Sequence, residues 1–298
     1  MGQKNSTDSA PVAACCPPDS EPPRTFEYEP KGGWSHAMES GDGDGPSGSL
    51  SVYSVGETAA PYLVLVLPDI FGVNSGRTVE ICDIISSKMN FRVVLMDPFD
   101  GSPYAEALQP KGFTFLWTTL TQTIPFVKKH TWEKVAPKIF SVIKASASEM
   151  PSLKGVFLVG FCWGTWANFK LCQSPSVAEA RLMGAVNFHP SFIVEKVHTS
   201  MFSSNDMKLC EGLQVPQLIC TAGNDAANTK TGGQMDVHLK SRAPPLGEVS
   251  EVRTWEGMIH GWVNRRDPND EKAVREADEA LESAIAFMQK ILESEKKA

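Results

Sequence analysis

Short apolar segments alternate with amphipathic segments from residue 50 onward, and this alternation restricts the fold more than any other feature of the chain. Strands are predicted at 50–54, 62–67, 92–96, 155–159, 183–188, 217–220 and 248–254. Helices are predicted at 77–89, 113–127, 133–148, 163–172 and 234–241. A final helix has apolar residues at helical spacing from Val274 to Ile291. The pattern therefore predicts an α/β fold, with a mostly parallel central sheet and helices on both faces.

The first 50 residues are rich in proline and glycine and poor in bulky apolar side chains. Such a composition buries too little apolar surface to offset the entropy lost on ordering. We predict a disordered tail at 1–33, a polar edge loop at 35–48 and one domain at 34–298. Cys15 and Cys16 are assigned to the tail, outside the folded core. The opening residues MGQKNS match the N-myristoylation pattern with Gly2 as acceptor, and an unmodified solvated tail is the alternative.

The composition argues against several classes of protein. A net charge of −7 disfavours a nucleic-acid surface, which needs clustered positive charge. Apolar runs are far shorter than the ~18 residues of a membrane helix, and no secretory signal pattern opens the sequence. Seven cysteines, an odd number, argue against a disulfide framework. We expect a cytoplasmic monomer that contacts membranes only if Gly2 is acylated.

The most specific motif is Gly160-Phe161-Cys162-Trp163-Gly164, which joins a predicted strand to a predicted helix. In this context Gly-x-Cys-x-Gly has the pattern of a nucleophile elbow, with cysteine in place of serine. The following helix would direct its positive end toward the sulfur, which favours the thiolate. The alternative is a buried cysteine in a glycine-rich turn. The strand–turn–helix context favours a nucleophilic role for Cys162.

A thiol nucleophile needs a base, and the base needs a group that orients it. Among the six histidines, His260 lies in a glycine-flanked loop between the last strand and the final helix. Asp225 follows another strand and would accept a hydrogen bond from the imidazole. His189 also follows a strand, but the adjacent Pro190 favours a structural turn. The order Cys162, Asp225, His260 is that of α/β-hydrolases, so we predict this fold and these catalytic residues.

Two backbone amides are expected to stabilise the oxyanion of an acyl-transfer intermediate. One belongs to Trp163, directly after the nucleophile, and the other to Ile70, after the strand 62–67. Asp69 would bring a carboxylate close to the thiol as an activating group. Residues 99–129 are predicted to cap the site. The aromatic candidates for a substrate pocket, each also suited to a core, are Phe71, Phe99, Tyr104, Trp117, Trp163 and Trp262.

Four segments resemble the dienelactone hydrolase family, the carboxymethylenebutenolidases: PDIFG at 68–72, GFCWG at 160–164, AGND at 222–225 and HGWV at 260–263. The resemblance covers roughly residues 50–295 and implies an α/β-hydrolase fold with a Cys–Asp–His triad. It assigns Cys162 as nucleophile, His260 as base and Asp225 as orienting group. Ile70 and Trp163 become the oxyanion-hole residues. In the bacterial enzymes a glutamate stands at the position of Asp69 and takes part in ionising the thiol.

The chain departs from that family where the bacterial enzymes bind the dienelactone carboxylate with arginines. One of those arginines lies four residues after the histidine, where this chain has Asn264. Arg265 and Arg266 are adjacent but are expected to point differently, and 97–104 contains no arginine. The resemblance therefore implies a hydrolase of esters or lactones in small molecules, with dienelactone itself not expected. The segment CCPP at 15–18 is similar to an N-terminal motif of some eukaryotic relatives.

The sequence leaves other functions open. A non-catalytic, lipid-anchored scaffold could retain this fold, since fold does not prove function. A glutaminase-type amidotransferase uses a similar elbow, but Gly261 and Trp262 follow His260 in place of the usual His-x-Glu. Cys162 could also act as a redox-sensing thiol. No metal-ligand spacing and no dinucleotide-binding glycine motif is present, so we expect no metal and no cofactor.

Overall fold

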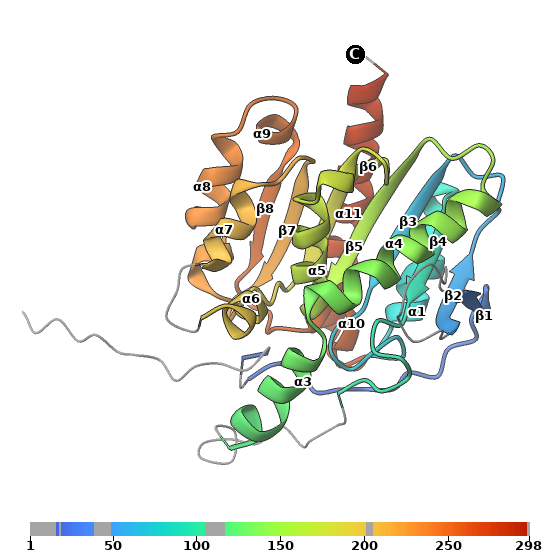
Figure 1. Cartoon of the computed structure of the whole chain (residues 1–298). Helices are drawn as coiled ribbons and strands as arrows, with labels where there is room; N and C mark the ends of the chain where they lie inside the picture. Colours follow the sequence, from blue (N-terminus) through green and yellow to red (C-terminus); the bar gives the residue numbers. More distant parts are fainter. Residues whose placement is uncertain (1–15, 18, 39–48, 105–116, 201–204, 297–298) are drawn as a thin grey trace, which may run out of the picture.

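The computed structural model describes residues 16–17, 19–38, 49–104, 117–200 and 205–296. Within these residues an eight-stranded sheet has the order β1-β2-β4-β3-β5-β6-β7-β8 (Figure 1). The strands are β1 (Gly33–Met38), β2 (Ser49–Val55), β3 (Tyr62–Leu67), β4 (Arg92–Met96), β5 (Gly155–Phe161), β6 (Leu182–Phe188), β7 (Gln217–Ala222) and β8 (Glu251–Trp255). Strands β1 and β2 pair antiparallel at one edge, and β3 to β8 run parallel.

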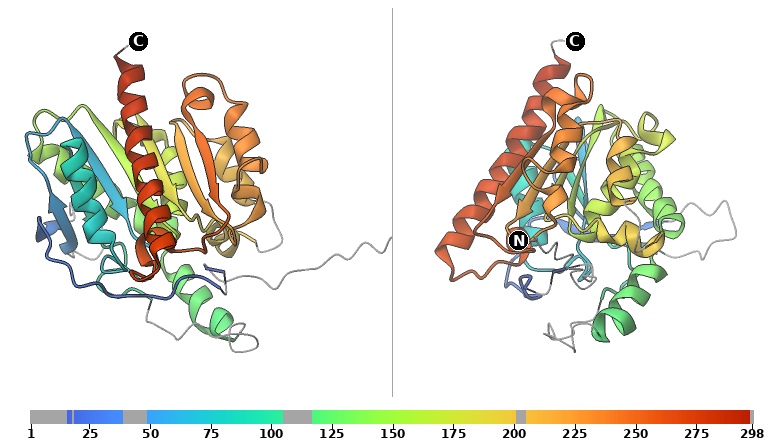
Figure 2. Two further views of the ribbon diagram at one scale, coloured as in Figure 1. Left: turned by 180° about the vertical axis from the view of Figure 1, so that it is seen from behind. Right: turned by 90° about the vertical axis from the view of Figure 1, so that its left-hand side faces the viewer.

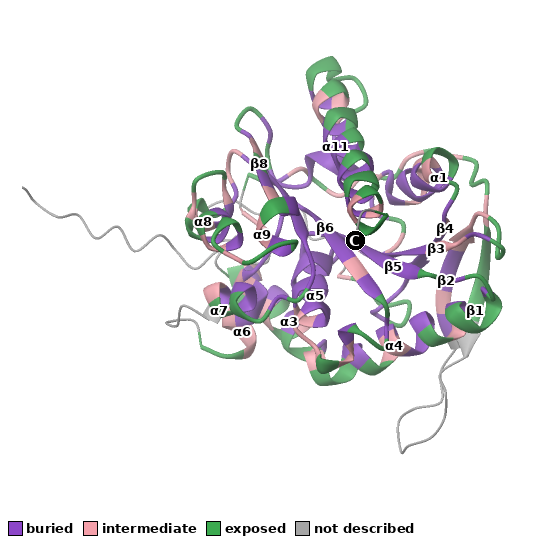
Figure 3. Ribbon diagram, turned by 90° about the horizontal axis from the view of Figure 1, so that it is seen from above, coloured by how far each residue is buried: buried purple, intermediate pink, exposed green. Residues whose placement is uncertain are grey.

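Helices cover both faces of the sheet (Figures 2 and 3). Helices α1 (Thr78–Met89) and α11 (Glu271–Glu295) pack on one face, and α4 (Trp132–Glu149) and α5 (Trp163–Cys172) pack on the other. Alternate residues of β3 enter the two cores, with Leu65 facing α4 and α5, and Val64 facing α1 and α11. The predicted sheet with helices on both faces is confirmed. The shorter helices are α3 (Ile124–Lys129), α6 (Ile193–His198), α7 (Asn205–Glu211), α8 (Gln234–Lys240), α9 (Leu246–Val249) and α10 (Trp262–Arg265).

Several stretches differ from the predicted secondary structure. The predicted strand 248–254 begins as the end of α9 and becomes β8 only at Glu251. Within the predicted helix 113–127, a π-helical turn at Thr119–Thr123 leads into α3, and residues 113–116 lie outside the described part of the chain. Helices α6 and α7 were not predicted, because segments of six or seven residues are too short to show a clear period.

Cys16, Pro17 and residues 19–31, which we call the N-terminal strap, run along the carboxyl edge of the sheet and continue into β1 (Figures 1 and 2). The Tyr28 hydroxyl and the Lys31 N–H both donate to Asp83 (2.7 and 2.9 Å). The structure therefore differs from the predicted disordered tail over residues 16–17 and 19–33, and β1 replaces the start of the predicted loop. Hydrogen bonds to buried groups such as Asp83 order this segment, so a segment with few apolar side chains can still be ordered.

The remaining expectations for the N-terminus concern residues that the structure does not describe. Gly2 and Cys15 lie outside the described residues. Across the described ranges, no helix combines the length and apolar character needed to cross a bilayer.

Candidate active site

Cys162 occupies a sharp turn between β5 and α5. Its backbone φ is 50° and its ψ is −108°, a conformation that residues other than glycine rarely adopt. Such strain costs about 1–3 kcal/mol and tends to occur at functional sites. The Cys162 N–H donates to the Phe188 carbonyl (3.1 Å), and the Thr165 N–H and hydroxyl donate to the Cys162 carbonyl (3.1 and 2.6 Å). These bonds hold the strained turn in place.

The two glycines of the elbow allow neighbouring backbones to approach closely. A Cβ on Gly164 would lie 2.3 Å from the Leu67 carbonyl oxygen, and a Cβ on Gly160 would lie 2.8 Å from the Gly164 carbonyl oxygen. The start of α5, which carries the Trp163 amide, therefore packs against the end of β3. The chain continues from β3 to the buried Ile70, so the two predicted oxyanion-hole residues come from adjoining segments.

Substituting Gly164 with alanine will destabilise the folded protein. The added Cβ meets backbone atoms of β3 that cannot rotate away, and such overpacking typically costs about 1–3 kcal/mol. We expect a lower Tm in thermal unfolding followed by circular dichroism. The matched control is Gly33→Ala, because Gly33 has open space around its Cβ position. Equal Tm values for the two variants would contradict the tight contact between α5 and β3.

His260 and Asp225 form a buried hydrogen-bonded pair at the carboxyl edge of the sheet. His260 Nδ1 lies 2.6 Å from Asp225 Oδ1. The Ala222 N–H donates to Asp225 Oδ2 (2.7 Å), and the His260 N–H donates to the Asn224 side chain (2.7 Å). Burial disfavours the charged imidazole, but the charges of Asp225 and Cys16 outweigh it and raise the pKa of His260 to about 9. The imidazole is therefore protonated at neutral pH.

The raised pKa of His260 has a consequence for stability. Protonation of His260 stabilises the fold fully below the unfolded pKa of 6.5, and this contribution is lost as the pH rises toward 9, at about 1.4 kcal/mol per pKa unit. The Asp225→Asn variant lacks the larger of the two charges that raise the pKa of His260. Urea unfolding at pH 6, 7.5 and 9.5 should therefore show a gap in unfolding free energy between wild type and variant that narrows as the pH rises. If the difference in unfolding free energy between wild type and variant stays constant or grows as the pH rises, the ion pair between His260 and Asp225 is not supported.

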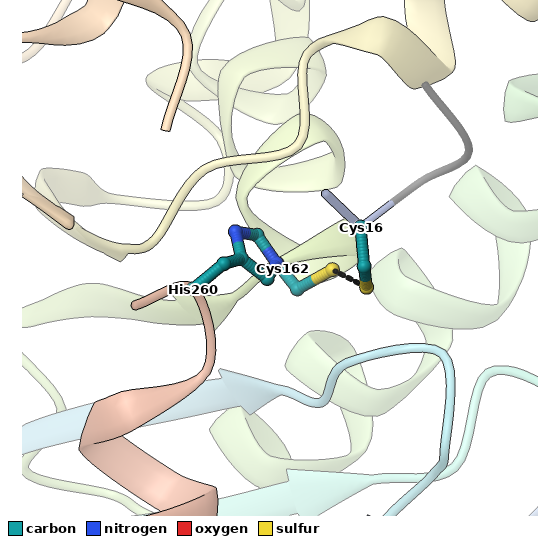
Figure 4. Close-up of side chains that lie close together, drawn as sticks. All are labelled: Cys16, Cys162 and His260. Atoms are coloured by element: carbon teal, nitrogen blue, oxygen red, sulfur yellow. Dashed lines mark hydrogen bonds between the residues drawn. The ribbon is translucent and has the colours of Figure 1, made fainter. Parts of the chain in front are cut away.

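Three side chains from distant parts of the chain meet at the elbow (Figure 4). The Sγ atoms of Cys16 and Cys162 lie 3.5 Å apart, and both lie within 4.8 Å of a ring nitrogen of His260. The structure thus brings together Cys162, His260 and Asp225, as predicted from the sequence. Cys16 corrects the expectation that both cysteines of the tail lie outside the fold. The two sulfurs and the imidazole also suit a soft metal ion, a possibility that spacing along the sequence does not reveal.

Asp69 is completely buried just after β3. Its Oδ1 accepts from the Phe71 N–H (2.9 Å), and its Oδ2 accepts from the Ser75 hydroxyl (2.8 Å) and the Asn264 amide (3.0 Å). Burial raises the pKa of the Asp69 carboxyl, while the nearby Arg265 cation and the side-chain hydrogen bonds oppose that rise. These contacts hold the carboxyl group beside α10, and its action on the thiol stays a prediction.

Arg265 brings a buried cation to the site. Its Nε lies 3.4 Å from Asp69 Oδ2, and its guanidinium carbon lies 4.7 Å from the centre of the Phe71 ring. Gly261 makes room for this side chain, because a Cβ there would lie 2.4 Å from Arg265 Nη2. Burial opposes the charge of Arg265, but Asp69 and the two site cysteines raise its pKa. Arg265, which follows Asn264, was expected to point differently from the arginine of the bacterial enzymes. In the structure its charge nevertheless lies at this site.

His189 is a site residue that sequence reasoning undervalued. Its φ is 39°, and its N–H donates to the Cys220 carbonyl (2.7 Å), in agreement with the predicted turn. Its ring, however, lies 4.8 Å from the His260 ring, and its Nε2 lies 3.2 Å from Asn264 Oδ1. Burial lowers the pKa of His189 well below its ordinary value, so the ring is neutral. Its position directly after β6 was the available signal.

The predicted pocket aromatics have different surroundings. Phe71 and Tyr104 meet edge to face, with ring centroids 6.1 Å apart, and the Arg265 guanidinium lies over the Phe71 ring. Trp262 is completely buried, with its ring centroid 5.7 Å from that of His189. This is a core position, the alternative that the sequence left open for Trp262. Trp117 is 60% exposed. Phe71 is therefore the stronger pocket candidate of the aromatic residues.

Comparison with known proteins relates the chain to one family and to several solved structures. The sequence model of the dienelactone hydrolase family matches residues 50–292. A protein from Klebsiella pneumoniae subsp. pneumoniae assigned to the dienelactone hydrolases has a TM-score of 0.58 and 13% identity, covering 88% of this chain and 100% of its own. The esterase Pf2001 of Pyrococcus furiosus has a TM-score of 0.55 and 12% identity, covering 91% and 98%. Est1E from Butyrivibrio proteoclasticus, solved with ferulic acid bound, has a TM-score of 0.53 and 9% identity, covering 86% and 99%. No curated protein matches the sequence.

The parallel sheet, the strained elbow and these structural neighbours define an α/β-hydrolase. The family match extends over most of the chain, so the protein belongs to the dienelactone hydrolase family and is a hydrolase of carboxylic esters. The resemblance found in the sequence is thereby confirmed. The identities to the solved structures are low, and that likeness establishes the fold alone.

Proposed function

We propose that this protein hydrolyses small carboxylic esters or lactones through a triad of Cys162, His260 and Asp225. The observation that carries the proposal is the strained turn at Cys162, with a ring nitrogen of His260 within 4.8 Å of its sulfur. A strained residue between a strand and a helix is typical of a nucleophile presented on an elbow. The 2.6 Å contact between His260 Nδ1 and Asp225 Oδ1 supports an imidazole that is oriented by the carboxylate and can exchange a proton with the reacting groups.

Acyl transfer would take place in two stages. The Cys162 thiolate attacks the carbonyl carbon, and the amides of Ile70 and Trp163 stabilise the tetrahedral oxyanion. The ester C–O bond then breaks, the leaving alkoxide takes the proton of His260, and the acyl group remains on Cys162 as a thioester. Neutral His260 next removes a proton from water, which attacks the thioester carbon. The acid product leaves, and the thiolate–imidazolium pair is restored.

The groups around the triad bear on the kind of substrate. Phe71 and Tyr104 pack against the apolar cluster that includes Cys162 and offer apolar contacts there. Arg265 is a buried cation, and part of its charge is balanced by Asp69. We propose an uncharged or weakly acidic ester or lactone as substrate and a cytoplasmic monomer as the working form. Acylation of Gly2 would add a weak membrane tether.

Trapping the thioester tests this function directly. The protein is mixed with p-nitrophenyl acetate, quenched in acid within the first turnover, and digested for mass spectrometry. We expect an acetyl group on the Cys162 peptide, together with a burst of p-nitrophenol of about one equivalent, as for other acyl-enzymes. The matched control is Cys210→Ala, which removes a buried cysteine of α7 and leaves the triad intact. Turnover without any acetyl group on Cys162 would exclude the proposed mechanism.

A further inference from the structure

The N-terminal strap is anchored to the segments that carry the triad. The Glu21 N–H donates to the carbonyl of His260 itself (2.7 Å). Arg24 donates from Nε to the Arg265 carbonyl (3.0 Å), and the Asn224 amide donates to the Asp19 carbonyl (3.2 Å). The strap is therefore held on both sides of the catalytic histidine.

These anchors place the first described residue of the strap over the nucleophile. Pro17 and Ser20 form a turn in which the Ser20 N–H and hydroxyl donate to the Pro17 carbonyl (3.2 and 2.5 Å). Cys16 lies at the end of this turn, half-buried, with its Sγ 3.5 Å from Cys162 Sγ (Figure 4). A bonded pair of sulfurs is about 2.05 Å apart, so a shift of the order of 1.5 Å would join them.

The electrostatic surroundings favour reaction between the two sulfurs. A ring nitrogen of His260 lies within 4.8 Å of both sulfurs, and the charge of the buried Arg265 guanidinium acts on both cysteines. A thiol near a cation ionises more readily, and the thiolate is the form that reacts with oxidants. Other described cysteines have different surroundings. Burial raises the pKa of Cys172 and of Cys210 to about 12, so these thiols stay protonated.

We propose that Cys16 and Cys162 form a reversible disulfide that switches the enzyme off under oxidation. The bond would occupy the sulfur that attacks the substrate, and it would protect that sulfur from irreversible oxidation. Formation of the disulfide depends only on the two thiols. Its effect on turnover rests on the proposed function, in which Cys162 is the nucleophile.

Hydrogen peroxide is the oxidant that we propose for this step. The Cys162 thiolate attacks one peroxide oxygen, the O–O bond breaks, and a sulfenic acid forms as water leaves after protonation of the hydroxide. The Cys16 thiolate then attacks the sulfenic sulfur, the S–O bond breaks, and a second hydroxide leaves as water. Two thiols and one peroxide thus give one disulfide and two waters. A dithiol such as dithiothreitol reverses the reaction by thiol–disulfide exchange.

The test uses the full chain, reduced and then treated with one to ten equivalents of peroxide in the presence of a chelator. Non-reducing peptide mapping should show the Cys16 peptide linked to the Cys162 peptide. Hydrolysis of p-nitrophenyl acetate should fall at least tenfold and recover with dithiothreitol. In Cys16→Ser no such link can form, so we expect Cys162 to become sulfinic acid, with a loss of activity that dithiothreitol does not reverse. The matched control is Cys15→Ser, the adjacent cysteine, which should behave as wild type.

The possible failures are distinguishable. A linked peptide pair in a protein that is inactive when reduced would leave the disulfide standing and remove the proposed function. An active protein that forms no link between Cys16 and Cys162, or links Cys162 to Cys15 instead, would overturn the inference. A third outcome would also overturn the inference, in favour of a metal site. The protein would purify with one equivalent of zinc, the zinc would be lost in Cys16→Ser, and a chelator rather than dithiothreitol would restore activity.

Discussion

Replacing Cys162 with alanine will lower the rate of p-nitrophenyl acetate hydrolysis by several orders of magnitude, since removing the nucleophile of a comparable hydrolase costs about 10⁶-fold in kcat. The reason is that both stages of acyl transfer pass through the Cys162 sulfur, which is the thiol presented by the strained turn at the start of α5. Alanine is smaller than cysteine and removes only the sulfur, so the fold should persist. The measurement is initial rates at several substrate concentrations, with circular dichroism to check folding.

The matched control for that variant is Cys82→Ala. Cys82 is completely buried in α1, within the apolar core on the opposite face of the sheet from Cys162. Its removal tests whether the loss of any buried thiol reduces the rate, and we expect a rate close to that of wild type. Similar rates for Cys162→Ala and wild type would favour the non-catalytic scaffold function.

Replacing Asp225 with asparagine will lower kcat by about 10⁴-fold, the size observed when the carboxylate of a comparable triad becomes an amide. Asp225 Oδ1 lies 2.6 Å from His260 Nδ1, and its other oxygen accepts from the Ala222 N–H. An asparagine that keeps its oxygen toward Ala222 would present its NH₂ group to the imidazole. The ring would then adopt the wrong tautomer and lose the charge that keeps it protonated.

The control for this effect is Asp236→Asn, in another buried carboxylate. Asp236 accepts from the Gly232 N–H (2.7 Å) and Lys240 Nζ (2.9 Å), away from the triad. We expect the Asp236 variant to lose stability but to keep kcat within severalfold of wild type. If the Asp225 variant also keeps its kcat, then His260 does not act as a base oriented by this carboxylate.

Much of the fold could be predicted because its signals are local. The apolar runs of β3, β5 and β6 indicate strands buried on both faces, and the spacing in α11 indicates an amphipathic helix. The elbow could also be found, because the strand, the two glycines and the helix around Cys162 are contiguous. Parallel strands end at the same edge, so residues that follow β7 and β8 could be expected to meet Cys162, which follows β5.

The predictions that differ from the structure share one cause, which is contact between residues far apart in the sequence. Composition predicted disorder over 1–33, yet residues of the strap are ordered by hydrogen bonds to side chains and carbonyls far along the chain. The direction of the Arg265 side chain could not be predicted from the sequence, because it depends on the left-handed turn at Gly261, where φ is 95°. His189 was undervalued because its closeness to His260 depends on the packing of two strand ends.

The sequence by itself determined the class of fold, the strand–turn–helix elbow at Cys162 and the family, since each depends on contiguous residues or on their order. The tertiary structure decided which charged and reactive groups surround that elbow. Cys16 and Cys162 are 146 positions apart, and Arg265 and Asp69 come from segments on either side of the sheet centre. Contacts of this kind depend on strand order and loop conformation, which no local pattern in the sequence encodes. Only the folded chain therefore shows that the proposed nucleophile lies beside a second thiol.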